Sequence, residues 1–194
     1  MFRAAQIFAV IALAASAQAQ AANYSSNYGP VVVQQCPSLP PDQLRIAKPM
    51  PQENPCAGNG TSVVVMTDYH LLYLCENGQQ IDNYDIAYGS NGTGKTAAGD
   101  RKTPLGTYSL GEPRKSDEFG IFIPVGYPTK AQVAKGFTGD AVGIHGPVRQ
   151  FRCVGFLNVV FDWTAGCMAV ADDGYIARIA NWVKAHPRAN LHIY

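Results

Sequence analysis

A histidine and a cysteine with glycine neighbours stand out in "AVGIHGPVRQFRCVGFLNVVFDWTAGCMAV", residues 141–170. We expect one strand to end at His145 and Gly146 and a second to end near Cys167, which brings an imidazole and a thiol together. A histidine that takes or holds the thiol proton makes a cysteine a nucleophile toward carbonyl carbons. Glycine beside each residue leaves backbone N–H groups open to an oxyanion, and here Gly166 and Cys167 are the candidate donors.

Each of these two residues also has a simpler interpretation. A single cysteine is typical of an inert, buried thiol, and a single histidine is typical of a hydrogen-bonded strand end. The combination of His145 upstream, Gly166 directly before Cys167 and an odd number of cysteines favours chemistry.

A second motif, "GSNGTGKT" at residues 89–96, matches the phosphate-loop pattern Gly-x-x-x-x-Gly-Lys-Thr, with "LNVVFD" as an accompanying strand that ends at Asp162. A phosphate loop joins a buried strand to a helix whose N-terminus faces the phosphates. The segment that follows, "AAGDRKTPLG", holds two glycines and a proline and excludes a helix. We therefore expect no nucleotide, and a flexible Gly-rich loop with an exposed Lys95.

The elements that must position these residues are mostly strands. Apolar and β-branched residues alternate with polar ones from residue 61 onward, and Asn77-Gly78 is typical of a hairpin turn. Strands are predicted over residues 61–67, 69–75, 79–89, 106–110, 120–125, 141–146, 157–163 and 191–194.

One helix is predicted, over "DDGYIARIANWVKAH". It begins behind an aspartate cap, Asp172 or Asp173, and ends before Pro187. Its apolar face consists of Ile176, Ile179, Ala180 and Val183. The fold is therefore mainly β with one C-terminal helix.

The N-terminus has the pattern of an export signal. A cationic start at Arg3 precedes an apolar stretch over residues 4–15, and Ala17-Gln18-Ala19 is a small-residue cleavage site. The apolar stretch is shorter than the roughly 20 residues that span a bilayer, and no later run is long enough. We expect cleavage after Ala19, a periplasmic or secreted protein, and no stable membrane span.

The remaining chain is predicted to hold one domain. Residues 20–59 are rich in proline and glutamine, which is typical of an extended arm, and residues 60–194 are the candidate catalytic domain. The 15 lysines and arginines nearly balance the 14 aspartates and glutamates, so no basic surface predicts nucleic-acid binding. The four histidines lack zinc spacing, and no metal is expected.

The five cysteines predict disulfides and one free thiol, because export favours oxidation and the number is odd. Cys36 and Cys56 flank the proline-rich part of the arm, and we expect them to clip it to itself or to the domain. We expect Cys153 to form a structural disulfide with Cys75. Its alternative role is that of a redox partner for Cys167.

These residues together resemble the L,D-transpeptidase catalytic domain family, also called YkuD-like. The family signature is a His-Gly strand end followed by Ser/Thr-x-Gly-Cys, here "IHG" and "TAGC". The segment "GDRKTPLGTYSL" is similar to the family's Thr-Pro-x-Gly segment, and "NGQQIDNYDIAYG" is similar to its hairpin. The resemblance covers residues 61–194, and "DWTAGCMAV" resembles the YafK-type subgroup. The fold implied is a mixed β-sandwich with one packed C-terminal helix.

The resemblance also implies a reaction on peptidoglycan stem peptides. Cys167 would attack the carbonyl of the third stem residue, release the terminal D-amino acid and form a thioester. His145 would hold the thiolate and then activate an acceptor amine or water. No cofactor is required, and a wall-attached protein is one candidate acceptor.

Further site residues are expected around this pair. Thr164 and Asp162 are candidates for orienting the site, although Asp162 is equally typical of a strand-end hydrogen-bond acceptor. Gly146, Trp163 and Tyr88 are candidates for lining the substrate groove.

Two positions depart from the family pattern. Many members have histidine two residues before the cysteine and arginine two residues after it, where this chain has Ala165 and Ala169. Arg149, Arg152 or Arg101 is a candidate substitute for binding a peptide carboxylate, and each is alternatively a solvated surface charge.

Three functions therefore stay open. The leading hypothesis is an exported transpeptidase, and the second is a hydrolase of the same fold, either an L,D-carboxypeptidase or an amidase that releases wall-linked protein. The third is a wall-binding module without turnover, which the residues at positions 165 and 169 favour. A slowly alkylated cysteine would favour this third function.

Overall fold

The computed structural model describes residues 50–194. The predicted signal peptide, residues 1–19, and most of the predicted arm, residues 20–59, lie outside the described residues. The strands are β1 (Ser62–Met66), β2 (Leu71–Glu76), β3 (Gln79–Ala87), β4 (Gly106–Ser109), β5 (Arg114–Ser116), β6 (Gly120–Pro124), β7 (Gly143–His145), β8 (Met168–Val170) and β9 (Asn190–Ile193). The helical elements are η1 (Thr67–Tyr69), α1 (Lys130–Ala134), η2 (Arg149–Val159) and α2 (Asp173–Ala185).

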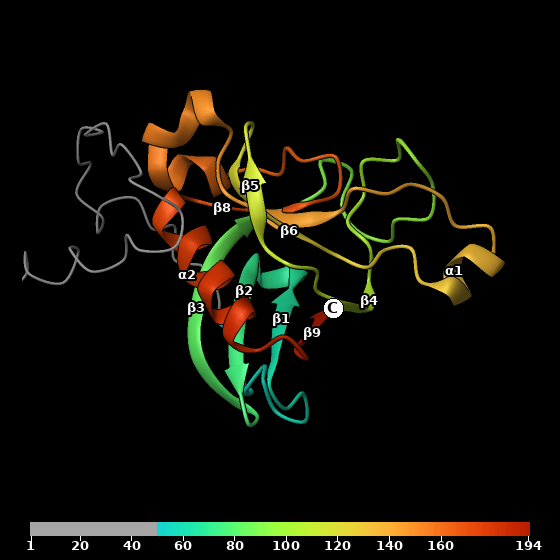
Figure 1. Cartoon of the computed structure of the whole chain (residues 1–194), viewed down its shortest axis with the longest axis horizontal. Coiled ribbons are helices and arrows are strands. Elements are labelled where there is room, and N and C mark those ends of the chain that lie inside the picture. Colours follow the sequence, from blue (N-terminus) through green and yellow to red (C-terminus); the bar gives the residue numbers. More distant parts are fainter. Residues whose placement is uncertain (1–49) are drawn as a thin grey trace, which may run out of the picture. The chain divides into compact units, whose positions relative to one another are not determined.

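The strands form one curled sheet in the order β4-β9-β1-β2-β3-β8-β7-β6-β5 (Figure 1). The long strand β3 joins its two halves, because its first part pairs with β2 while Ile86 and Ala87 pair with β8. Neighbours are antiparallel except for β1 with β9 and β7 with β8. The mainly β, mixed fold predicted from the sequence is confirmed.

The β1-β2-β3 meander forms where the alternating apolar pattern predicted it. Asn77 and Gly78 both have positive φ, +52° and +76°, as the tight turn between β2 and β3 requires. The valines of β1 and most of β2 are buried, so this part of the sheet is covered on both faces.

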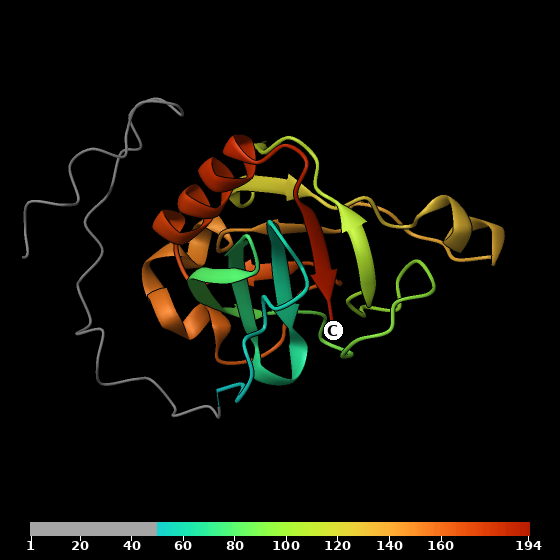
Figure 2. The ribbon, with the colours of Figure 1, turned by 90° about the horizontal axis from the view of Figure 1, so that it is seen from below.

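Helix α2 confirms the prediction at both ends. The Asp172 side chain accepts a hydrogen bond from the Tyr175 N–H at 2.9 Å, and the helix ends one residue before His186. The buried residues are the four predicted ones, Ile176, Ile179, Ala180 and Val183. Figures 1 and 2 show α2 alongside the sheet, and α1 at the far end of a projecting loop.

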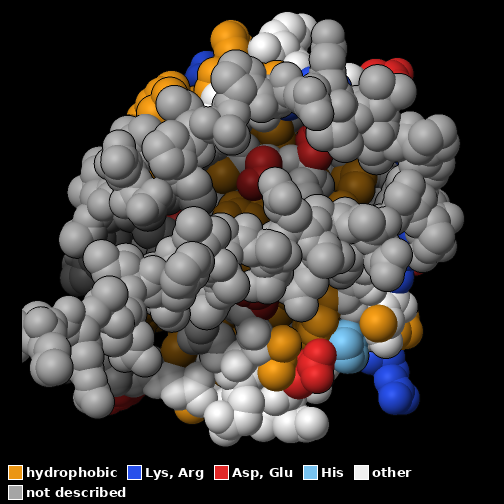
Figure 3. Space-filling view, turned by 90° about the vertical axis from the view of Figure 1, so that its left-hand side faces the viewer, with side chains coloured by type: hydrophobic (Ala, Val, Ile, Leu, Met, Phe, Trp, Pro, Cys, Tyr) orange, Lys and Arg blue, Asp and Glu red, His pale blue; other side chains and the backbone are white. Residues whose placement is uncertain are grey.

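The strand predicted over residues 157–163 is wrong. This segment belongs to the irregular 3-10 element η2 and the bend after it, with a break at Gly155, where φ is +54°. The apolar side chains of this segment do not form the buried face of a sheet, because Leu157, Val160 and Phe161 are exposed. Hydrophobic side chains reach the surface along the upper edge of the molecule in Figure 3.

The disulfides differ from the predicted pairs. Cys56 bonds to Cys75 on β2, so it ties its segment to the domain, and the Cys36–Cys56 and Cys75–Cys153 pairings are both wrong. Cys153 is also disulfide-bonded. Within the described residues Cys167 is the free thiol. The pairing follows from tertiary contact, because Cys56 and Cys75 are both fully buried in one core cluster.

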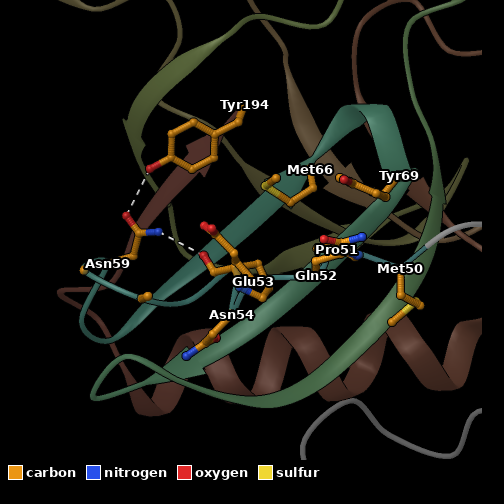
Figure 4. Close-up of a pocket in the computed structure, with 12 residues that line it drawn as sticks. Met50, Pro51, Gln52, Glu53, Asn54, Asn59, Met66, Tyr69 and Tyr194 are labelled. Carbon is orange, nitrogen blue, oxygen red and sulfur yellow. Dashed lines mark hydrogen bonds between the residues drawn. The ribbon is translucent and has the colours of Figure 1, made fainter.

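A pocket lies between residues 50–59 and the neighbouring ends of β1 and β9 (Figure 4). Tyr194 closes one side by donating from its hydroxyl to the Asn59 side chain at 3.0 Å. Met66 at the end of β1 and Tyr69 in η1 also line the pocket. It contains none of the candidate catalytic residues. No helix within residues 50–194 has the length and apolar character needed to cross a bilayer.

Candidate active site

His145 is the last residue of β7 and lies deep in the sheet, 1 % exposed. Its Nδ1 lies 2.7 Å from the carbonyl oxygen of Gly146. Because a carbonyl can only accept, this contact assigns the proton to Nδ1 and leaves Nε2 as an acceptor. The backbone therefore holds the imidazole in the tautomer of a general base.

Aromatic rings surround His145. Its ring stacks on Phe119 with centroids 3.8 Å apart, meets the edge of Trp163 at 5.8 Å, and lies 6.3 Å from Phe122. Burial lowers the pKa of His145 to about 4, against the hydrogen bond to Gly146, which raises it. The imidazole is therefore neutral at pH 7, with Nε2 unprotonated.

Cys167 directly precedes β8, the strand parallel to β7. His145 pairs with Ala169, and Cys167 stands two residues before Ala169, a spacing that returns a side chain to the same face of a strand. The two segments are neighbours, but the thiol stands at the start of a strand, whereas we expected it at a strand's end. The imidazole stands at the end of the adjacent strand.

The resting thiol is protonated. Its Sγ contacts the Ala141 carbonyl at 3.5 Å. Burial raises the pKa of Cys167 to about 11, although the Gly143 backbone and the charge of Lys95 lower it. At pH 7 the thiol and the imidazole are therefore both neutral.

The Thr164 side chain and close packing at Gly166 hold the Thr164–Cys167 turn in place. The Thr164 hydroxyl donates to the Cys167 carbonyl at 2.7 Å and accepts from the Gly166 N–H at 3.1 Å. Gly166 has φ +126°, and a Cβ there would lie 2.5 Å from the Lys102 carbonyl oxygen. Of the two predicted oxyanion donors, the Gly166 N–H is thus engaged by Thr164 in this structure.

Thr103 is a supporting residue that sequence reasoning did not single out. Its hydroxyl donates to the Gly166 carbonyl at 3.0 Å and accepts from the Gly89 N–H at 2.9 Å. Thr103 opens the Thr-Pro-x-Gly segment noted in the sequence, and this motif was the available signal.

Asp162 is bound away from His145. Its carboxylate contacts His70 Nε2 at 3.1 Å and accepts from the Tyr88 N–H at 3.0 Å. The His70 and Tyr88 rings stack with centroids 4.6 Å apart. Asp162 therefore links the segment before the active turn to the loops that follow β1 and β3. His70, to which the sequence assigned no role, is part of this cluster.

The other candidates have structural partners. Trp163 donates from its indole to the Asn158 carbonyl at 2.8 Å. Arg149 donates to both carboxylate oxygens of Asp173, at 2.7 and 2.8 Å, and so ties η2 to α2. Gly146 allows a close approach, because a Cβ there would lie 2.8 Å from the Phe119 carbonyl oxygen.

The expectation of an exposed Lys95 is wrong. Lys95 is 5 % exposed, and its ammonium bonds to Asp100 at 2.8 Å and to the Ala97 carbonyl at 3.1 Å. Asp100 organises the loop, because it also accepts from the N–H groups of Thr96, Ala97 and Lys102. Burial opposes its charge, but these hydrogen bonds outweigh burial and hold the pKa of Asp100 far below its usual range. As the glycines and proline indicated, no helix follows the loop.

The chain belongs to the L,D-transpeptidase catalytic domain (YkuD) family, whose model matches residues 60–189. The resemblance inferred from "IHG" and "TAGC" is thereby confirmed. This family acts on peptidoglycan stem peptides, so the domain is that of a peptidoglycan-related enzyme. No curated protein matches the chain.

Solved structures share the fold at low sequence identity. The helical cell shape determining protein Pgp2 from Campylobacter jejuni aligns with a TM-score of 0.57 at 22% identity, covering 74% of this chain and 51% of that one. Bd1075 from Bdellovibrio bacteriovorus aligns with a TM-score of 0.51 at 20% identity, covering 69% and 47%. This chain therefore spans about half the length of these structures.

Proposed function

We propose that this protein is an exported, cysteine-dependent L,D-transpeptidase that forms a thioester with peptidoglycan stem peptides. The observation that carries the proposal is the buried, neutral His145, held by Gly146 in the base tautomer, on the strand next to the free thiol of Cys167. An inert pair would need neither the fixed tautomer nor a turn before the thiol that only glycine fits.

The first half-reaction forms the acyl-enzyme. His145 Nε2 takes the thiol proton while Cys167 Sγ attacks the carbonyl carbon of the third stem residue. The Cys167 N–H is the proposed oxyanion donor, since the Gly166 N–H bonds to Thr164. His145 then gives its proton to the nitrogen of the departing D-amino acid, the C–N bond breaks, and a thioester remains.

The second half-reaction restores the enzyme. His145 takes a proton from an acceptor amine, the amine nitrogen attacks the thioester, and the C–S bond breaks as a new amide forms. The sulfur regains its proton from His145. The acceptor is an amine of a second stem peptide or of a wall-attached protein.

The surrounding candidates take supporting roles in this proposal. Thr164 holds the turn that presents the thiol, and Trp163 packs against the base. Gly146 supplies the carbonyl that orients the base. Asp162 positions Tyr88, which we assign to the wall of the substrate groove.

Hydrolysis is the second candidate, because the same thioester is cleaved when water arrives in place of an amine. Ala169, where many members carry arginine, is fully buried in an apolar cluster with Ala87 and Val159, so this position offers no charge to a substrate. With water as the acceptor, the protein would be an L,D-carboxypeptidase or an amidase of the YafK type.

Intact mass spectrometry of the mature protein with tetrapeptide-bearing muropeptides tests the proposal, with Cys167→Ala as the matched control. We expect a covalent adduct on the wild type alone, together with dimeric products. An adduct with only trimmed monomers would make the protein a hydrolase. Turnover by a folded Cys167→Ala variant would end the assignment of Cys167 as nucleophile.

A further inference from the structure

Lys95, in the Gly-rich loop of residues 89–96, has a buried ammonium that the mechanism above does not use. Lysine is almost never this buried unless its charge is paired, since burial of an ammonium costs several kcal/mol. The pairing with Asp100 offsets that cost, but it does not explain why the charge lies inside the molecule.

The stem of Lys95 lies against two glycines. Its Cε is 3.2 Å from the position that a Cβ would take at Gly139, and its Cδ is 3.7 Å from that position at Gly166. Gly166 directly precedes Cys167, so the stem packs beneath the turn that presents the thiol. The Thr103 hydroxyl bonds to the Gly166 carbonyl, and the Thr103 carbonyl accepts from the Gly94 N–H, so the loop and the turn are joined.

The charges that act on Cys167 are few. The Lys95 ammonium favours the anionic sulfur, while the exposed carboxylate of Glu118 acts against it. His145 is neutral at pH 7, and positions 165 and 169 are alanines. Asp100 bonds to Lys95 and to the loop backbone.

We propose that Lys95 is a positioning residue for Cys167, whose stem supports the Gly166–Cys167 turn and whose ammonium stabilises the sulfur as it becomes an anion. The Gly-rich loop thereby supplies the positive charge next to the nucleophile that position 169 lacks. The importance of Lys95 for turnover rests on the proposed function, whereas the effect of Lys95 on the Cys167 thiol is independent of any substrate.

Lys95→Met tests the charge, because methionine keeps most of the apolar stem and removes the ammonium. The single variant leaves the Asp100 carboxylate without its ion-pair partner, so the double variant Lys95→Met/Asp100→Asn removes both charges. Lys102→Met is the matched control, since Lys102 is a partly buried lysine seven residues after Lys95 whose charge is not among those that act on Cys167.

The readout is the rate at which iodoacetamide alkylates Cys167 between pH 7 and 10, followed by intact mass, with circular dichroism to verify folding. A nearby opposite charge shifts a pKa by about one unit or more, so we expect alkylation to slow about 3- to 10-fold in both Lys95 variants. The Lys102→Met variant should stay within about twofold of wild type, because the charge of Lys102 is not among those that act on Cys167.

The direction of the change separates charge from scaffolding. A side chain that only supported the turn would, once removed, loosen it and speed alkylation. Unchanged or faster alkylation in the folded double variant overturns the proposal, whatever the single variant does.

The muropeptide assay distinguishes this inference from the proposed function. If the folded double variant is alkylated more slowly while the wild type forms no acyl adduct, the inference stands and the proposed function fails. If the double variant forms the adduct at the wild-type rate and is alkylated normally, the inference fails and the function stands.

Discussion

The Nδ1 of His145 lies 2.7 Å from the carbonyl oxygen of Gly146, the next residue along the chain. A backbone carbonyl thus holds the base in place, in the role that a carboxylate takes in many triads. Asp162, the acidic residue that the sequence offered for orienting the site, bonds instead to His70 and to the backbone of Tyr88. The tautomer of His145 therefore depends on main-chain geometry.

Replacement of the base should abolish acylation. Loss of a general base costs about 10²- to 10⁴-fold in rate, and we expect at least 100-fold slower adduct formation for His145→Gln, measured by intact mass. His186→Gln is the control, because His186 bonds to a carbonyl at the end of α2. Equal adduct rates in the two variants would remove His145 from the mechanism.

Stability should fall in mild acid because of the same histidine. The pKa of His145 is lowered from 6.5 to about 4 in the folded protein, so the unfolded chain binds more protons below pH 6.5. The neutral His145 therefore contributes to the free energy of unfolding fully above pH 6.5. This contribution is lost as the pH falls toward 4, and the loss is about 3 kcal/mol at most. Urea unfolding at several pH values measures it. His145→Gln should flatten this dependence, and an identical slope in that variant would contradict the assignment.

Gly166 should tolerate no side chain. Gly166→Ala places a Cβ 2.5 Å from the Lys102 carbonyl oxygen at a positive φ, so we expect both the adduct and about 2–4 kcal/mol of stability to be lost. Gly92→Ala is the control, because Gly92 also has a positive φ, +82°, but nothing lies within 4 Å of its Cβ position. We expect that variant to lose about 1 kcal/mol, the cost of placing a Cβ in the left-handed region. Equal losses in urea unfolding would show that the close contact is unimportant.

Arg149 should contribute to stability and little to substrate binding. Its guanidinium is bound to Asp173, and both side chains are about one third exposed, so Arg149→Met should cost about 1 kcal/mol. Asp173→Asn should cost a similar amount, and both variants should acylate within about twofold of wild type. A several-fold rise in KM for Arg149→Met alone would instead indicate that it binds a peptide carboxylate, as the sequence hypothesis holds.

Local signals made several elements predictable. The Asp172 cap and the apolar spacing of α2 lie within one segment, as do the Asn77-Gly78 turn and the alternation of β1 to β3. The residues of the candidate pair, His145 and Cys167, were recognisable because their glycine neighbours stand beside them in the chain.

Contacts between distant segments decided the rest. Cys56 bonds to Cys75 because both enter one core cluster, and Asp162 bonds to His70 across 92 residues of chain. Residues 157–163 are apolar like a buried strand, yet several of them are exposed. A polar, glycine-rich sequence predicts a solvated loop, and only the packed turn before Cys167 shows that Lys95 is buried beneath it. Sequence spacing determined which groups can react, and tertiary packing determined their partners, because burial and pairing depend on residues far apart in the chain.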